Sequence, residues 1–187
     1  MTLKTFLLAL LPLFALPAAA LEYGIDPAHT YASFEVDHLG FSTQRGQFRQ
    51  STGTIEFDSE AQRGSVDITI DASSLDTGLV ARDEVLRGEH WFNIGAFPAI
   101  IFRSEHLVFD QGKLIAIDGR LILLGETRPL RLEITRLKCG LNLANRKRGC
   151  GADAQAVLLR SDFGMLNSVP FIGDRVRLLI QVEAYLP

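Results

Sequence analysis

Residues 176–186 read VRLLIQVEAYL, and apolar side chains occupy every second position of this stretch. One face carries Val176, Leu178, Ile180, Val182, Ala184 and Leu186, and the opposite face carries Arg177, Gln181 and Glu183. A period of two is typical of a β-strand with one face buried and the other in water. The stretch therefore predicts a long strand and a β-rich fold.

The same alternation recurs along most of the chain, at residues 31–38, 54–57, 66–71, 130–135 and 152–160. Residues 99–108 and 114–124 are more continuously apolar, which predicts strands covered on both faces. Short turns such as Gly112-Lys113 and Gly125-Glu126 separate the segments and favour antiparallel neighbours. We therefore expect an all-β fold, an eight-stranded antiparallel barrel, although a sandwich of two sheets would show the same periodicity.

One interval departs from the alternation, between Ser74 and Asn93. Its apolar residues recur near helical spacing, Asp76 is placed to cap a helix, and Gly88 is placed to end one. We expect a short helical segment near the barrel opening. It would act either as a plug that buries Leu86 and Trp91 or as a lid over an apolar cavity, and the pattern leaves both open.

The first twenty residues have the features of a secretory signal peptide. Lys4 precedes an apolar stretch from Phe6 to Leu16, and small residues follow at positions 18–20. A membrane anchor is less favoured because the stretch is short and is interrupted by Pro12. We expect a signal peptide at 1–20, an exported domain at 21–187, and cleavage after Ala20.

Export bears on Cys139 and Cys150, which are the two cysteines of the chain. An oxidising compartment favours a disulfide between them, whereas a metal or redox pair lacks the usual two-residue spacing. The intervening segment contains Arg146-Lys147-Arg148, which could touch anionic headgroups or simply be solvated.

Composition and motifs argue against several function classes. The chain has 187 residues with 19 Lys and Arg against 22 Asp and Glu, so its net charge of −3 disfavours nucleic acid as a partner. It contains no G-x-S-x-G, P-loop or dinucleotide motif, and its four histidines lie in separate segments. We predict no catalytic residue, no metal site and no enzymatic activity. The abundant apolar residues favour binding of an apolar molecule, or they simply fill the barrel.

Several motifs in order resemble one family. The first are YGIDPAHT at 23–30, VDHLG at 36–40 and RGQF at 45–48. The others are LDTG at 75–78, RDE at 82–84, WF at 91–92, FP at 97–98, GETRP at 125–129 and RSDFG at 160–164. Together they resemble the YceI-like family of exported lipid-binding proteins over residues 23–185. The sequence departs from that pattern at Val85 and at HWFN, residues 90–93, so cavity shape could differ.

The resemblance implies a lipocalin-like barrel whose cavity holds a polyisoprenoid or isoprenoid quinone, for carriage or storage in the periplasm. It implies no required cofactor beyond this ligand. It leaves open a membrane donor or acceptor protein as partner, and a homodimer. The alternative is an interaction protein of a membrane redox system in which the lipid is structural.

Candidate ligand contacts follow from the strand faces and from the helical segment. The tail would lie against Phe34, Val36, Phe57, Ile68, Phe102 and Phe163, together with Leu86, Trp91 and Phe92. The head would lie near Arg45, Arg82 and His38. A salt bridge from Arg82 to Asp76 or Asp83 is an equal alternative for that arginine. The facing pattern also places Glu35 outside, opposite Phe34.

Overall fold

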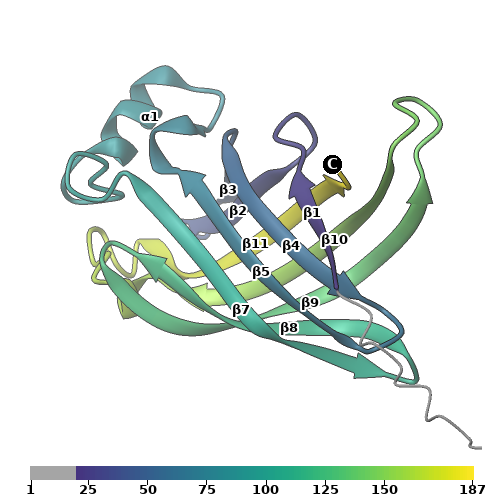
Figure 1. Ribbon diagram of the computed structural model, residues 1–187. Helices are drawn as coiled ribbons and strands as arrows, with labels where there is room; N and C mark the ends of the chain where they lie inside the picture. Colours follow the sequence, from purple (N-terminus) through teal and green to yellow (C-terminus); the bar gives the residue numbers. More distant parts are fainter. Residues whose placement is uncertain (1–19) are drawn as a thin grey trace, which may run out of the picture.

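The computed structural model describes residues 20–187, and its strands wind around a common axis (Figure 1). The expected signal peptide therefore lies outside the described residues, apart from Ala20. The strands are β1 (Leu21–Ile25), β2 (Tyr31–His38), β3 (Ser42–Phe48), β4 (Ser51–Asp58), β5 (Arg63–Asp71), β6 (Leu75–Asp76), β7 (Ala99–Asp110), β8 (Lys113–Leu123), β9 (Glu126–Leu141), β10 (Arg148–Leu159) and β11 (Ile172–Tyr185). Two 3₁₀ turns, η1 (Ala72–Ser74) and η2 (Arg160–Phe163), and the helix α1 (Val80–Arg87) complete the fold.

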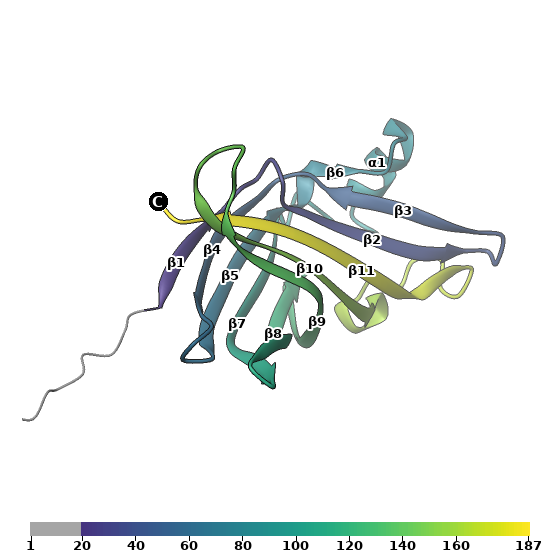
Figure 2. The same cartoon turned by 90° about the vertical axis from the view of Figure 1, so that its right-hand side faces the viewer.

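Eight antiparallel strands close into a ring, in the order β1-β4-β5-β7-β8-β9-β10-β11. The short strand β1 closes it because Tyr23 pairs with Ile55 of β4 and Gly24 pairs with Tyr185 of β11. The expected eight-stranded barrel is confirmed, and closure decides between barrel and sandwich. Strands β2 and β3 extend the sheet along the first half of β11, and β6 pairs with β3 (Figure 2).

The two ends of the barrel differ, and both views place them far apart (Figures 1 and 2). The helix end carries α1, η2, the β2–β3 turn and the segment between η2 and β11. The hairpin end carries the turn at 142–147 between β9 and β10.

Strand faces follow the alternation. In β11, Val176, Leu178 and Ile180 line the interior while Arg177 lies outside. The expectation that residues 99–108 and 114–124 are covered on both faces is wrong. Burial alternates along β7 and β8, and Ile115 is 41% exposed because the outer face of these strands meets solvent.

Helix α1 has only eight residues, fewer than the interval from Ser74 to Asn93 suggested. Gly88 ends it, as expected, with its N–H donating to the carbonyl of Val85. The expected cap is wrong: Leu79 occupies the N-cap position without a side-chain bond, and Asp76 lies in β6, where it pairs with Arg49 at 3.0 Å. Strand pairing of β6 with β3 thus holds Asp76 away from the helix start. Among residues 20–187 no helix is long and apolar enough to cross a bilayer.

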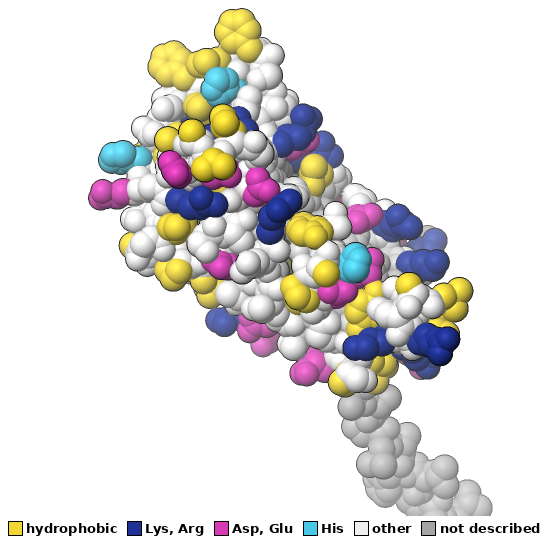
Figure 3. Space-filling model, turned by 90° about the horizontal axis from the view of Figure 1, so that it is seen from above, with side chains coloured by type: hydrophobic (Ala, Val, Ile, Leu, Met, Phe, Trp, Pro, Cys, Tyr) yellow, Lys and Arg dark blue, Asp and Glu magenta, His cyan; other side chains and the backbone are white. Residues whose placement is uncertain are grey.

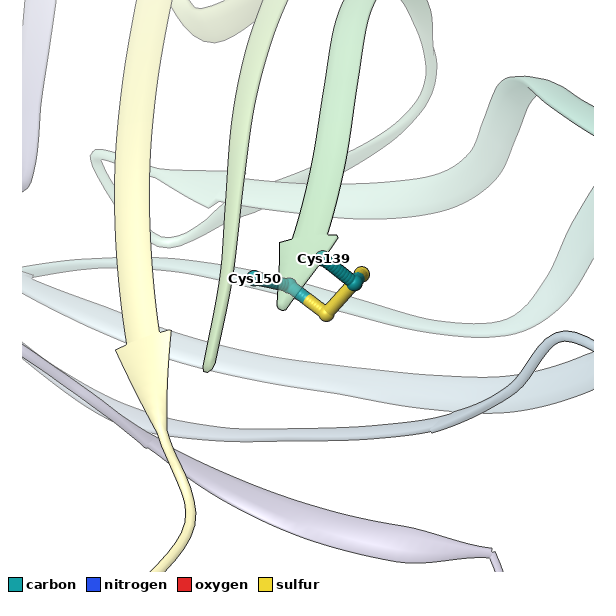
Figure 4. The surroundings of a disulfide bond; sticks show 2 residues. All are labelled: Cys139 and Cys150. Atoms are coloured by element: carbon teal, nitrogen blue, oxygen red, sulfur yellow. A yellow bond between two sulfur atoms is a disulfide. The ribbon is translucent and has the colours of Figure 1, made fainter. Parts of the chain in front are cut away.

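The expected disulfide is confirmed. Cys139 of β9 and Cys150 of β10 lie directly opposite each other in the strand register, and their sulfurs are bonded (Figure 4). The segment from Gly140 to Gly149 is less of a loop than the sequence suggested, because the strands continue to Leu141 and resume at Arg148. The bond therefore braces a β-hairpin near its tip.

Candidate functional site

A cavity of about 470 Å³ occupies the interior of the barrel. Aliphatic and aromatic side chains from every ring strand, from β2 and β3 and from α1 form most of its wall. Eleven of the twelve candidate ligand contacts lie on this wall, namely Phe34, Val36, His38, Arg45, Phe57, Ile68, Arg82, Leu86, Trp91, Phe92 and Phe102. Glu35 does not, so the assignment of opposite faces to Phe34 and Glu35 agrees with the structure.

Three phenylalanine rings form a cluster toward the helix end of the cavity. The ring centroids of Phe48 and Phe92 lie 5.2 Å apart in an edge-to-face arrangement, and Phe34 lies 6.1 Å from each. Gly46 lies opposite Phe34 on β3, and a Cβ there would collide with the Phe34 ring. The glycine of the RGQF motif thus makes room for an aromatic side chain that faces the cavity.

Leu86, Trp91 and Phe92 all line the cavity at the helix end. The plug was expected to pack Leu86 and Trp91 against the core; Leu86 does so, but Phe92 packs there in place of Trp91. Gating by this segment stays a prediction.

Phe163 is the exception among the tail candidates. Its side chain is buried, but it packs in the core around η2 and lines a separate polar pocket with Glu89 and His90 instead of the main cavity. The reason is local: strand β10 ends at Leu159, so the alternation no longer sets the direction of side chains beyond that point. The prediction that Phe163 faces the ligand space is therefore wrong.

Arg82 joins α1 to the wall of the cavity through hydrogen bonds. Its Nε donates to Thr77 Oγ1 at 2.8 Å, one Nη donates to the Thr77 carbonyl at 2.7 Å, and the other donates to Gln44 Oε1 of β3. The buried carboxylate of Asp83 accepts from the Thr77 N–H and hydroxyl instead. The alternative salt bridge from Arg82 to Asp76 or Asp83 is therefore wrong.

Arg45 and His38 have different surroundings. Arg45 lines the cavity edge, but its guanidinium lies outside, where Nε contacts Glu35 Oε1 at 2.8 Å. This follows from the register, since Arg45 pairs with Glu35 and shares its outward face. His38 ends β2 and lines the cavity at the helix end. Of the candidate head contacts, His38 and Arg82 remain inside.

Arg160 is a cavity residue that the candidate contacts omitted. It is 3% exposed, and it donates to the carbonyls of Gly173, Met165 and Ile172 at 2.7 to 2.9 Å. Its guanidinium also lies 5.3 Å from the centroid of the Trp91 ring. Burial lowers the pKa of Arg160 from its usual value. Its position in the RSDFG motif was the one sequence signal for this role.

Exposed apolar side chains surround the helix end. Phe41 at the β2–β3 turn is 89% exposed, and Phe171 and Leu166 follow η2. Leu39 donates its N–H to the Phe171 carbonyl at 2.8 Å, so the two segments are adjacent. Figure 3 shows large hydrophobic side chains gathered at the top of the view.

One group of side chains in the described part of the chain has metal-ligand geometry, and it lies outside the cavity. Asp26, His29 and Glu183 approach one another near the hairpin end. His29 Nδ1 lies 2.8 Å from Asp26 Oδ2, and this hydrogen bond raises the pKa of His29 and lowers that of Asp26. Glu183 accepts from the Tyr185 hydroxyl at 2.5 Å, which raises the pKa of Tyr185. These pairings account for the cluster without an ion.

Comparison with known proteins agrees with this architecture. A family model described as a YceI-like domain matches residues 23–184. Proteins named Protein YceI from Salmonella arizonae and Salmonella heidelberg are 33% identical over 169 residues, which are 89% of this chain and 87% of theirs.

Solved structures share the fold. BcnA of Burkholderia cenocepacia aligns with a TM-score of 0.71 at 21% identity, over 86% of this chain and 99% of that one. A YCEI protein of Campylobacter jejuni aligns with a TM-score of 0.70 at 24% identity, over 81% of this chain and 90% of that one. A polyisoprenoid binding domain from Saccharophagus degradans aligns with a TM-score of 0.68 at 15% identity, over 89% of this chain and 99% of that one.

Proposed function

This chain belongs to the YceI-like family, and we propose that it binds one long-chain polyisoprenoid or isoprenoid quinone inside its barrel, for carriage or storage in the periplasm. The observation that carries the proposal is the cavity, whose wall is apolar along the barrel and has its arginine and amide groups at the helix end. The polyisoprenoid binding domain with the same fold supports the ligand class. The leader-like residues 1–20 support export.

The wall suits a flexible hydrocarbon tail. Phe57 lies toward the hairpin end, Ile68 and Phe102 lie on adjacent strands, and Phe34 lies toward the helix end. Burial of apolar surface contributes about 25 cal/mol per Å² removed from water, so a long tail gains its affinity from many small contacts. No single residue is expected to dominate binding.

The helix end suits a polar head. Arg82, Gln44 and Thr77 form one hydrogen-bonded group at the cavity wall. A head with acceptor oxygens competes with Gln44 for the Arg82 guanidinium, because a charged donor prefers the stronger acceptor. The chemistry proposed is binding without turnover, since this group orients a ligand and offers no activated nucleophile.

The test is direct. The protein is purified from a periplasm, extracted with organic solvent, and its bound lipid is identified by mass spectrometry alongside native-mass stoichiometry. We expect one isoprenoid lipid per barrel. Protein that carries no lipid and also refuses added isoprenoids would overturn the proposal.

A pair of variants tests the assignment of faces. Phe34→Asp places a carboxylate in the apolar cavity and should weaken lipid uptake at least about 100-fold, because a buried unpaired charge costs several kcal/mol. Glu35→Ala removes a side chain on the outer face and should leave uptake unchanged. Val36→Asp repeats the test at the next inward position, and circular dichroism checks the fold of each variant. Equal loss in folded Phe34→Asp and Glu35→Ala proteins would contradict the assignment.

A further inference from the structure

The β9–β10 hairpin concentrates positive charge at one end of an otherwise acidic protein. Residues 136–148, called the basic hairpin below, include five cations and no acidic residue, while the whole chain has a net charge of −3. The cations are Arg136, Lys138, Arg146, Lys147 and Arg148, and all five are exposed. Within residues 20–187 none of them lies in ion-pair distance of a carboxylate.

The acidic side chains nearest to this hairpin are fewer than its cations, and two of them already make hydrogen bonds to other side chains. Asp153 lies opposite Arg136, and Glu183 lies opposite Gly151 but accepts from the Tyr185 hydroxyl. Asp26 feels the charge of Lys147, but its carboxylate is bonded to His29. Five cations against three carboxylates leave a local excess of positive charge.

Two leucines accompany the cations. Leu141 is 58% exposed and Leu143 is 84% exposed, and both belong to the basic hairpin. Figure 3 shows Lys and Arg side chains together with hydrophobic ones at the lower right of the molecule. Exposed apolar side chains among cations are typical of surfaces that enter the headgroup region of an anionic bilayer.

The tip is held in shape before any partner binds. The N–H of Asn142 donates to the Lys147 carbonyl, and Asn142 Nδ2 donates to the Tyr185 hydroxyl at 2.7 Å. The bond between Cys139 and Cys150 closes the base of the turn. Because the backbone is already ordered, docking costs little further conformational entropy.

We propose that the basic hairpin docks this protein on an anionic phospholipid surface, with the cations on the headgroups and Leu141 and Leu143 in the interface. An acidic protein or a nucleic acid would satisfy the cations but offers no general reason for the exposed leucines. This contact is independent of what the cavity holds, because it uses the outer tip of the barrel.

The test uses the purified protein after removal of its leader and two kinds of vesicle, pure phosphatidylcholine and an equal mixture of phosphatidylcholine and phosphatidylglycerol. We expect binding to the anionic vesicles that weakens with added salt, and little binding to the neutral ones. Arg146→Gln combined with Lys147→Gln and Arg148→Gln should weaken anionic binding on the order of 100-fold, since each cation contributes about 1 kcal/mol.

A matched variant removes three exposed cations elsewhere, Lys113→Gln with Arg120→Gln and Arg175→Gln, and changes the net charge equally. Its binding should stay within about twofold of the original protein, since these charges lie outside the hairpin. Leu143→Ser should weaken binding about tenfold without altering the salt dependence. Equal loss in the two triple variants, or no binding to anionic vesicles, would overturn the proposal. Lipid loading of the cavity, measured in the same variants, separates this outcome from failure of the proposed function.

Discussion

The two ends of this barrel use arginine in opposite ways. At the helix end, the Arg160 side chain is buried and donates to three carbonyls, and Arg82 donates to Thr77 and Gln44. At the hairpin end, Arg146 and Arg148 are exposed and make no ion pair within residues 20–187, and a disulfide holds the backbone. The same side chain is thus a structural donor at one end and a surface charge at the other, because burial obliges every donor to find an acceptor.

The two ends of the barrel are also stabilised by different interactions. Near η2, Arg160 donates to the Met165 carbonyl, which lies outside the sheet, and to the Ile172 and Gly173 carbonyls at the start of β11, where the register with β2 is interrupted. In the hairpin the strand ladder already satisfies the backbone, and the covalent bond adds a constraint on the unfolded chain. This contrast predicts the size of three effects.

The largest effect should follow Arg160→Met. We expect the free energy of unfolding to fall by about 3 to 5 kcal/mol, because three carbonyl oxygens lose a buried donor. Arg128→Met at the same end is the control, since Arg128 is exposed and pairs with Glu126, and it should cost less than about 1 kcal/mol. Chemical denaturation measures both. Similar losses of unfolding free energy in the two variants would contradict the prediction that a buried arginine stabilises this end more than an exposed one.

A smaller effect should follow Cys139→Ser combined with Cys150→Ser. The loss should be at most about 3 kcal/mol, the chain-entropy value for a loop this short. Hydrogen exchange should increase around residues 139–150 and stay unchanged around η2, because the constraint is local to the hairpin. Lipid uptake should be retained. Increased exchange at the helix end would show that the two ends are coupled.

The smallest effect should come from pH. The hydrogen bond to Asp26 raises the pKa of His29 above its ordinary 6.5, so protonated His29 stabilises the fold below that value. The contribution is lost as pH rises through the raised value in the folded protein. Asp26 has a lowered pKa, and its contribution persists across this range. As the pH rises from about 6 to 8, the midpoint temperature of thermal unfolding should therefore fall slightly for the original protein. It should fall less for His29→Gln. A larger fall of the midpoint temperature in His29→Gln would contradict the prediction, because it would mean that protonated His29 does not stabilise the fold.

Much of the cavity wall could be predicted from periodicity, and particular residues show where that ends. Phe34, Ile68 and Phe102 lie inside regular strands, where alternation sets the direction of each side chain. Phe163 lies just beyond a strand, and its predicted direction was wrong. Arg45 lines the cavity edge, but its pairing with Glu35, which periodicity does not reveal, turns its guanidinium outward, and its role as a head contact stays a prediction.

The sequence by itself determined eight of the strands, the inward faces of those that alternate, the ending of α1 at Gly88 and the pairing of the cysteines, because each depends on residue type or on short spacing. It did not indicate β1, β3 or β6. Only the tertiary structure decided closure through β1, the bonds of Arg82 to Gln44 and of Arg160 to its three carbonyls, and the separation of a polar-walled end from a basic one. Closure of the sheet sets which distant residues meet, and hydrogen bonds reach only about 3 Å. Such partners therefore exist only once the register of the whole barrel is formed.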